Sequence, residues 1–137
     1  MEKAKRQRAL AALAQARVAN AWPRLAASAV SALVATSVLG TLAPLLWWFG
    51  LIPIVVTDRA LYARLLSRCE RNDPPASVRG LIVWTAAGSL YGNILAALLW
   101  FAPYIPGETL AVMYICGGLA NAAASLRSWP ALALAGL

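Results

Sequence analysis

Residues 25–57, LAASAVSALVATSVLGTLAPLLWWFGLIPIVVT, form a run of 33 residues without a charged side chain. About 20 apolar residues already cross the hydrocarbon core of a bilayer, so the run is too long for one ordinary span. Gly40 and Pro44 interrupt it, and both residue types favour turns over continued helix. The run therefore predicts a hairpin of two transmembrane helices, at about 25–42 and 45–66.

Two further uncharged runs follow the hairpin, at 80–101 and 109–126. Each has the length and apolar composition of a membrane span. A polar segment at 67–79, with the breaker Asp-Pro-Pro, precedes the first, and a Pro- and Gly-containing turn at 103–108 separates the two. Another apolar run starts at 129. The sequence predicts an all-α fold, a polytopic transmembrane helical bundle with about four spans and a truncated fifth.

The N-terminal segment 1–24 differs from the rest of the chain because it carries six basic side chains and one acidic one. Its middle is rich in alanine, a good helix former, and Trp22 and Pro23 are expected to end that helix. Basic helices of this kind lie on membrane surfaces that contain anionic lipid. We expect 1–24 to be a basic amphipathic cytoplasmic lead-in to a transmembrane domain at 25–137.

The distribution of charge predicts an orientation. The chain is 61% hydrophobic and 12% charged, with a net charge of +7 and a mean hydropathy of +0.67. All 12 basic residues lie within 1–24, within 59–79 or at Arg127, so they flank the apolar runs. The positive-inside rule then predicts a multi-pass membrane protein with a cytoplasmic N-terminus. Trp47 and Trp48 would lie in the outer aromatic belt.

The residue types exclude several chemistries. The chain has no histidine, which removes Ser-His and Cys-His catalysis and leaves no plausible zinc ligand set. No nucleotide-binding glycine motif occurs, and no basic stripe interleaved with aromatics suggests nucleic acid. The sequence predicts no catalytic residue, metal or cofactor in this chain. No carboxylate lies securely within the core of a predicted span, and the nearest is Asp58, beside Arg59, which weighs against ion-coupled transport.

Small residues recur at helical spacing and are candidates for close helix packing. These are Gly88, Gly92 and Ala96 in one span, and Gly117, Asn121 and Ser125 in the next. They favour packing within the chain, with homodimerisation through the GxxxG of Gly88 and Gly92 as the alternative. Polar side chains at membrane depth form a second set, either as interhelical hydrogen-bonding groups or as a ligand pocket. That set is Ser89, Asn93 and Asn121.

The order of these parts resembles the N-terminal multi-helix membrane input region of bacterial hybrid sensor histidine kinases and GGDEF-type diguanylate cyclases. The resemblance rests on an Arg-rich helical tail, a span with small and aromatic residues, and a small-residue span followed by a basic turn and another apolar run. These are LYARLLSRCERND (61–73), WTAAGSLYGNILAALLWFAP (84–103) and GGLANAAASLRSWPALALAGL (117–137). The resemblance implies a place in the bacterial inner (plasma) membrane, and two further spans, a coiled coil and catalytic modules outside this chain.

We therefore expect a membrane-embedded sensory or anchoring domain of a two-component or cyclic-dinucleotide signalling protein. The lipid bilayer is its first partner, and the parent protein would form a homodimer. No particular small-molecule ligand follows from the sequence. Two alternatives stay open: a small transporter or channel subunit, and an accessory subunit of a membrane complex.

Overall fold

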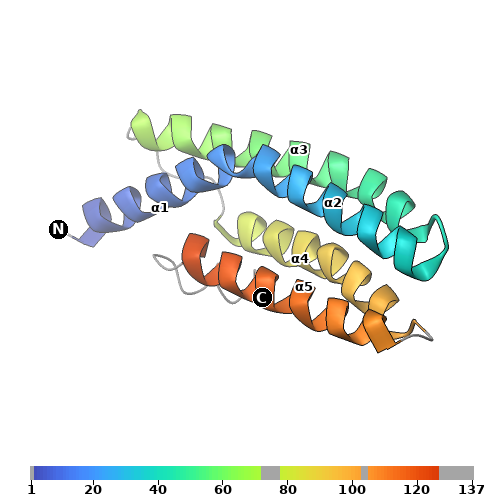
Figure 1. Ribbon diagram of the computed structural model, residues 1–137. Coiled ribbons are helices and arrows are strands. Elements are labelled where there is room, and N and C mark those ends of the chain that lie inside the picture. Colours follow the sequence, from blue (N-terminus) through green and yellow to red (C-terminus); the bar gives the residue numbers. More distant parts are fainter. Residues whose placement is uncertain (1, 72–77, 103–104, 127–137) are drawn as a thin grey trace.

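The computed structural model describes residues 2–71, 78–102 and 105–126, and every regular element in this part of the chain is an α-helix (Figure 1). The all-helical fold is thereby confirmed. The five helices are α1 (Glu2–Ala19), α2 (Ala21–Leu39), α3 (Ala43–Glu70), α4 (Val78–Trp100) and α5 (Ile105–Leu126). Residue 129, where a fifth span was expected to start, lies outside the described residues.

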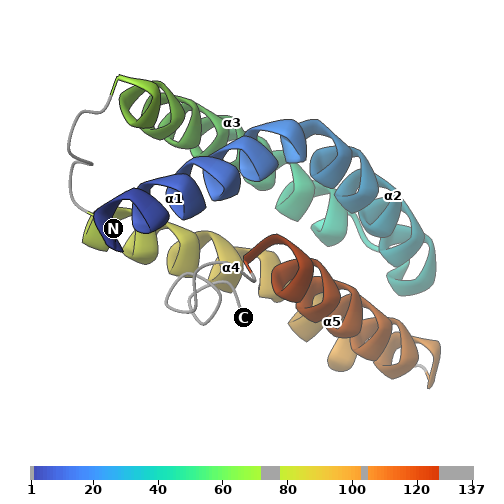
Figure 2. The same cartoon turned by 90° about the vertical axis from the view of Figure 1, so that its left-hand side faces the viewer.

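The helices form two groups that face each other. In both ribbon views α1, α2 and α3 lie together, and α4 and α5 form a hairpin beside them (Figures 1 and 2). α1 and α2 meet at a bend (Figures 1 and 2), but the backbone hydrogen bonds Asn20 N to Ala16 O and Arg24 N to Asn20 O, both 3.0 Å, continue the helical pattern through their junction. Trp22 and Pro23 thus lie in the first turn of α2, where a proline is tolerated, and do not end a helix.

The turn between α2 and α3 follows from local chemistry. Gly40 adopts φ 64°, a left-handed conformation that favours glycine, and its N–H donates to Thr36 O at 2.9 Å. Pro44 occupies the first turn of α3, where its missing N–H costs no helical hydrogen bond. The two helices extend beyond the predicted intervals mainly at their charged ends, α2 toward Ala21 and α3 toward Glu70.

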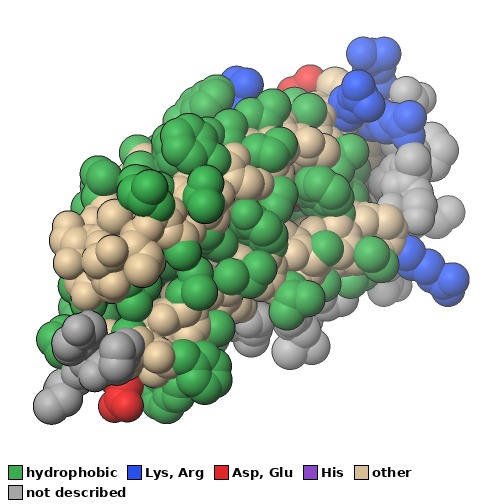
Figure 3. Space-filling view, turned by 90° about the vertical axis from the view of Figure 1, so that its right-hand side faces the viewer, with side chains coloured by type: hydrophobic (Ala, Val, Ile, Leu, Met, Phe, Trp, Pro, Cys, Tyr) green, Lys and Arg blue, Asp and Glu red, His purple; other side chains and the backbone are tan. Residues whose placement is uncertain are grey.

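Three helices are long and apolar enough to cross a membrane: α2, α3 and the Arg79–Trp100 part of α4. Few of their side chains are buried inside the bundle, and large apolar groups such as Val30, Leu46 and Leu90 face outward. Figure 3 shows this apolar surface over the body of the molecule, with Lys and Arg side chains gathered at one end. An apolar exterior of this extent suits lipid rather than water. The fourth span, at α5, stays a prediction.

The first core cluster joins α1 to α3. Leu10, Leu13 and Ala14 of α1 are buried against Tyr62 and Leu65 of α3. A hydrogen bond from Gln7 Nε2 to Cys69 O, 3.0 Å long, adds a polar contact between the same helices. α1 therefore packs its apolar side on α3, and its position at the membrane surface stays a prediction.

The second core cluster lies toward the other end of the bundle and joins both groups of helices. It contains Ala32 and Ala35 of α2, Trp47, Leu51 and Val55 of α3, Leu95 and Leu99 of α4, and Ala111 of α5. Trp47 is only 5% exposed, so it is a core residue and not part of a lipid-facing aromatic belt. The small residue Ala96, a predicted packing position, is also buried.

Candidate functional site

A buried ionic cluster links α1, α2 and α3. The Asp58 Oδ2 atom lies 3.8 Å from Arg17 Nη1 and 3.5 Å from Arg24 Nη1. The side chains of Arg17 and Asp58 are 11% and 10% exposed, whereas that of Arg24 is 35% exposed. The two arginines are seven residues apart, and helical hydrogen bonding continues through the junction between them, so they lie on the same side, two turns from each other. The Asp58 carboxylate on α3 therefore contacts both guanidinium groups.

This cluster continues to α4 through aromatic and hydroxyl groups. The Arg17 guanidinium lies over the ring of Tyr62, 5.7 Å from its centroid. The Tyr62 hydroxyl is 3.0 Å from Thr85 Oγ1 on α4, and both residues are buried. Arg59, although adjacent to Asp58 in sequence, is exposed and lies over Trp22 instead. The arginine that the sequence places beside Asp58 is thus not one of its partners.

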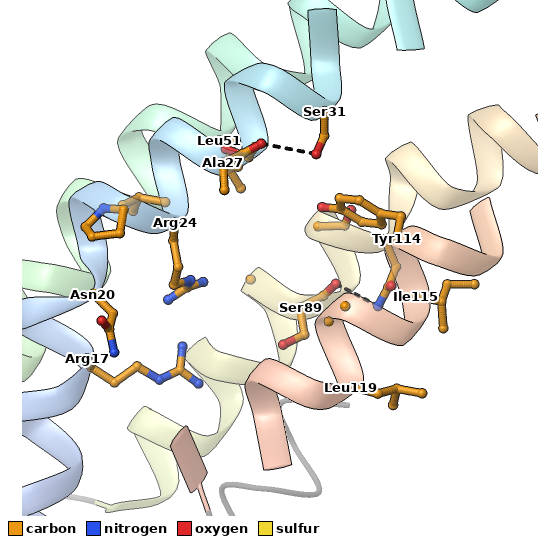
Figure 4. Close-up of a pocket in the computed structure, with 18 of the residues that line it drawn as sticks. Arg17, Asn20, Arg24, Ala27, Ser31, Leu51, Ser89, Tyr114, Ile115 and Leu119 are labelled. Atoms are coloured by element: carbon orange, nitrogen blue, oxygen red, sulfur yellow. Dashed lines mark hydrogen bonds between the residues drawn. The ribbon is translucent and has the colours of Figure 1, made fainter. Parts of the chain in front are cut away.

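An open cleft of about 630 Å³ separates the two groups of helices. Figure 4 shows the side chains of Arg17 on α1 and Arg24 on α2 directed toward this space, with Ser89 and Tyr114 across from them. Leu51 of α3 also lines the cleft. The cleft therefore has a cationic wall at the α1–α2 junction and a mixed polar and apolar wall on α4 and α5.

The residues predicted from the sequence are distributed as follows. Ser89 and Asn93 both line the cleft, as do Gly88, Gly92 and Gly117. Asn93 Nδ2 donates to Ser89 O at 3.0 Å, so this amide is hydrogen-bonded within its own helix. The side chains of Asn121 and Ser125 lie outside the described part of the structure. α4 thus brings two of the three predicted polar residues to one cavity.

The predicted glycine packing positions differ in their surroundings. A Cβ atom added to Gly88 would lie 3.6 Å from Ile54 Cγ2, an ordinary contact, whereas one added to Gly92 or Gly117 would meet no atom within 4 Å. Gly92 and Gly117 therefore border open space within this chain. Whether the Gly88–Gly92 face pairs with a second copy stays a prediction.

The closest approach of a described glycine to another helix involves Gly50, which the sequence did not single out. The Tyr91 hydroxyl occupies the space that a Gly50 side chain would need. Tyr91 OH donates to Trp47 O at 3.0 Å, and Trp47 Nε1 donates to Tyr91 O at 2.9 Å. The two rings are nearly parallel, with centroids 6.4 Å apart. This reciprocal pair fastens α3 to α4.

We expect Gly50→Ala to destabilise the protein by about 1–3 kcal/mol, because the new methyl group displaces Tyr91 and breaks this pair. Gly92→Ala is the matched control, since its methyl group enters open space and alanine favours helix. Thermal unfolding in detergent should show a lower midpoint for the first variant only. Equal midpoints for both variants would contradict the close approach at Gly50.

The arginines and Asp58 are the part of the site that sequence reasoning missed. A signal did exist, because the seven-residue spacing of Arg17 and Arg24 places them on one helical face. It could be recognised only if the helix of 1–24 continues into the first span. The expected helix end at Trp22 and Pro23 concealed that continuity.

The described residues define a class: a helical protein in which three helices are long and apolar enough to cross a membrane, with an arginine-lined cleft between its two groups of helices. The chain matches no family model, no curated protein and no solved structure.

Proposed function

We propose that this chain is the membrane-embedded sensory and anchoring input domain of a bacterial signal-transduction protein. A sensor histidine kinase is the first candidate for the parent protein and a diguanylate cyclase the second. The observation that carries this proposal is the cleft between the two groups of helices, with ionisable side chains on one wall. A ligand bound in a cleft between two groups of helices can alter how the groups pack against each other.

The mechanism requires two arrangements of the helices with different affinity for the signal. Hydrogen bonds join the α3 side to α4 at two points, Tyr62–Thr85 and Trp47–Tyr91. Between these points Leu51 and Val55 of α3 pack in the second core cluster and also line the cleft, so the direct contacts between the two groups border it. A ligand that fits the open cleft would favour a wider separation, and its loss would favour closure. Helices that follow α5 in the parent protein would pass this change to the cytoplasm.

Orientation follows from the charge distribution under the same proposal. Arg68 and Arg71 at the end of α3 and Arg79 at the start of α4 would face the cytoplasm, and Glu108 would face outward. The N-terminus is then cytoplasmic, and the membrane is the bacterial inner membrane. α5 completes a set of four spans.

A change of these cations tests the orientation. We expect that replacing Arg68, Arg71 and Arg79 with glutamate reverses or mixes the topology, because the positive charges that retain this loop are lost. Reporter fusions on the 103–108 turn would report its side of the membrane. An unchanged reporter signal would show that these arginines do not set the orientation.

The buried carboxylate does not favour the transporter alternative. An acid that binds a coupled cation or proton must be available to it. Asp58 instead lies beside two guanidinium groups, which occupy its carboxylate and repel cations. Asp58 therefore suits a structural role, and the two arginines of the cluster suit anion recognition.

The direct test of the proposed function is the open reading frame that contains this chain. We expect the codons after Leu137 to encode further spans, then a coiled coil and a kinase or cyclase module. A stop codon directly after Leu137 would contradict the input-domain role and favour a small stand-alone membrane subunit.

A further inference from the structure

We infer that the cleft binds the phosphate headgroup of an acidic phospholipid through Arg17 and Arg24. The inference rests on the proposed function, since it names the ligand class of the same cleft. It follows from the charge balance of the cluster, the unused donors of its arginines, and the composition of the cleft walls.

The charge balance of the cluster leaves one positive charge uncompensated. Two guanidinium groups share one carboxylate at Asp58, so the cluster carries a net charge of +1. Arg17 and Arg24 are the charged side chains that line the cleft among the described residues. An unbalanced buried cation is costly in a medium of low dielectric constant, and an anion in the cleft would remove that cost.

The arginines also have donors to offer. Both contact the same Asp58 oxygen through a single Nη1 atom, at 3.5 and 3.8 Å, whereas a strong charge-assisted hydrogen bond measures about 2.7–2.9 Å. The Arg17 Nε atom is buried and, in the described structure, has no hydrogen-bond partner. A guanidinium carries five N–H donors arranged to bind phosphate in pairs. The two arginines therefore retain N–H donors with which to bind an anion.

The shape and walls of the cleft favour a lipid over free phosphate. At about 630 Å³, it is far larger than a phosphate ion. Across from the arginines, α5 lines it with the ring of Tyr114 and with Gly117 and Gly118, which leave open space beside the helix, whereas Figure 4 shows the side chains of Ile115 and Leu119 directed away from it. An amphiphile would place its headgroup on the arginines and an acyl chain along α5. Basic pockets between helices on the cytoplasmic side are known to suit such headgroups.

Native mass spectrometry of the purified 137-residue chain in detergent tests this inference. We expect retention of phosphatidylglycerol but not of zwitterionic phosphatidylcholine. Arg24→Gln should lower phosphatidylglycerol occupancy about tenfold, the loss expected for one charge-assisted hydrogen-bonded contact. Arg59→Gln is the matched control and should retain it fully, because Arg59 lies over Trp22 and not on the cleft.

Two further arms keep the outcome decisive. Gly92→Leu fills the cleft without removing a charge and should abolish lipid retention, even if Arg24→Gln proves unstable. Inorganic phosphate at millimolar concentration should not displace the lipid. Equal retention of both lipids, unchanged retention in Gly92→Leu, or displacement by inorganic phosphate would overturn the inference. None of these results depends on what the reading frame encodes after Leu137, so each proposal can fail without the other.

Discussion

Asp58→Ala should lower the free energy of unfolding by about 3 kcal/mol, because it leaves two arginines in the bundle without their counter-ion. Loss of one member of a buried ion pair costs about 3–5 kcal/mol, and the lower end applies here because Arg24 is 35% exposed. The helices most affected are α1 and α2, which the carboxylate joins to α3. Denaturant titration of the purified protein in detergent measures the change.

Glu70→Gln is the matched control for that variant. Glu70 lies on the same helix and also carries a carboxylate, but it is exposed, so its loss should change stability by less than about 0.5 kcal/mol. A double-mutant cycle of Asp58→Asn with Arg24→Gln should give a coupling energy above about 0.5 kcal/mol, since the residues are in contact. Additive effects in that cycle would show that the Arg24–Asp58 contact contributes nothing.

Tyr62→Ala should cost about 3–5 kcal/mol, the range for removing a large buried aromatic side chain. Tyr62 has no exposed surface, and it packs in the cluster that joins α1 to α3. Its removal opens a cavity, takes the ring from beneath Arg17 and leaves the Thr85 hydroxyl without its partner. Trypsin cleavage after Arg17 should become faster, because α1 detaches more readily.

The conservative variant Tyr62→Phe separates packing from hydrogen bonding. It keeps the ring and removes only the hydroxyl, so we expect a loss of about 1 kcal/mol and little change in cleavage after Arg17. If Tyr62→Ala leaves the cleavage rate at Arg17 unchanged, then α1 is not held by this cluster.

The helical and apolar character of the fold could be predicted because it depends on local composition. Long uncharged runs require helices in lipid, since only a helix satisfies its own backbone polar groups there. The turn after α2 was equally local, because Gly40 supplies the left-handed conformation and Pro44 starts the next helix. Ser89 and Asn93 could be singled out because polar side chains are rare at membrane depth, and both line the cleft, but their role as a ligand pocket stays a prediction.

The remaining features depend on contacts between residues far apart in the chain. The Tyr62–Thr85 and Trp47–Tyr91 pairs join residues 23 and 44 positions apart, which no local pattern encodes. The packing of α1 on α3 was missed for a different reason. A basic, alanine-rich helix suits a lipid surface and a protein surface equally well until its partner is known.

A distance measurement across the cleft tests most directly whether occupancy of the cleft sets the packing of the bundle. Spin labels at Leu33 on α2 and Val112 on α5, both exposed and neither lining the cleft, would report the separation of the two helical groups once Cys69 and Cys116 are replaced by alanine and serine. We predict that pulsed electron–electron double resonance gives a shorter mean distance between the labels in phosphatidylcholine vesicles than in vesicles that contain phosphatidylglycerol. Arg24→Gln should abolish the difference. An identical distance distribution in both membranes would contradict the claim that occupancy of the cleft sets the packing of the bundle.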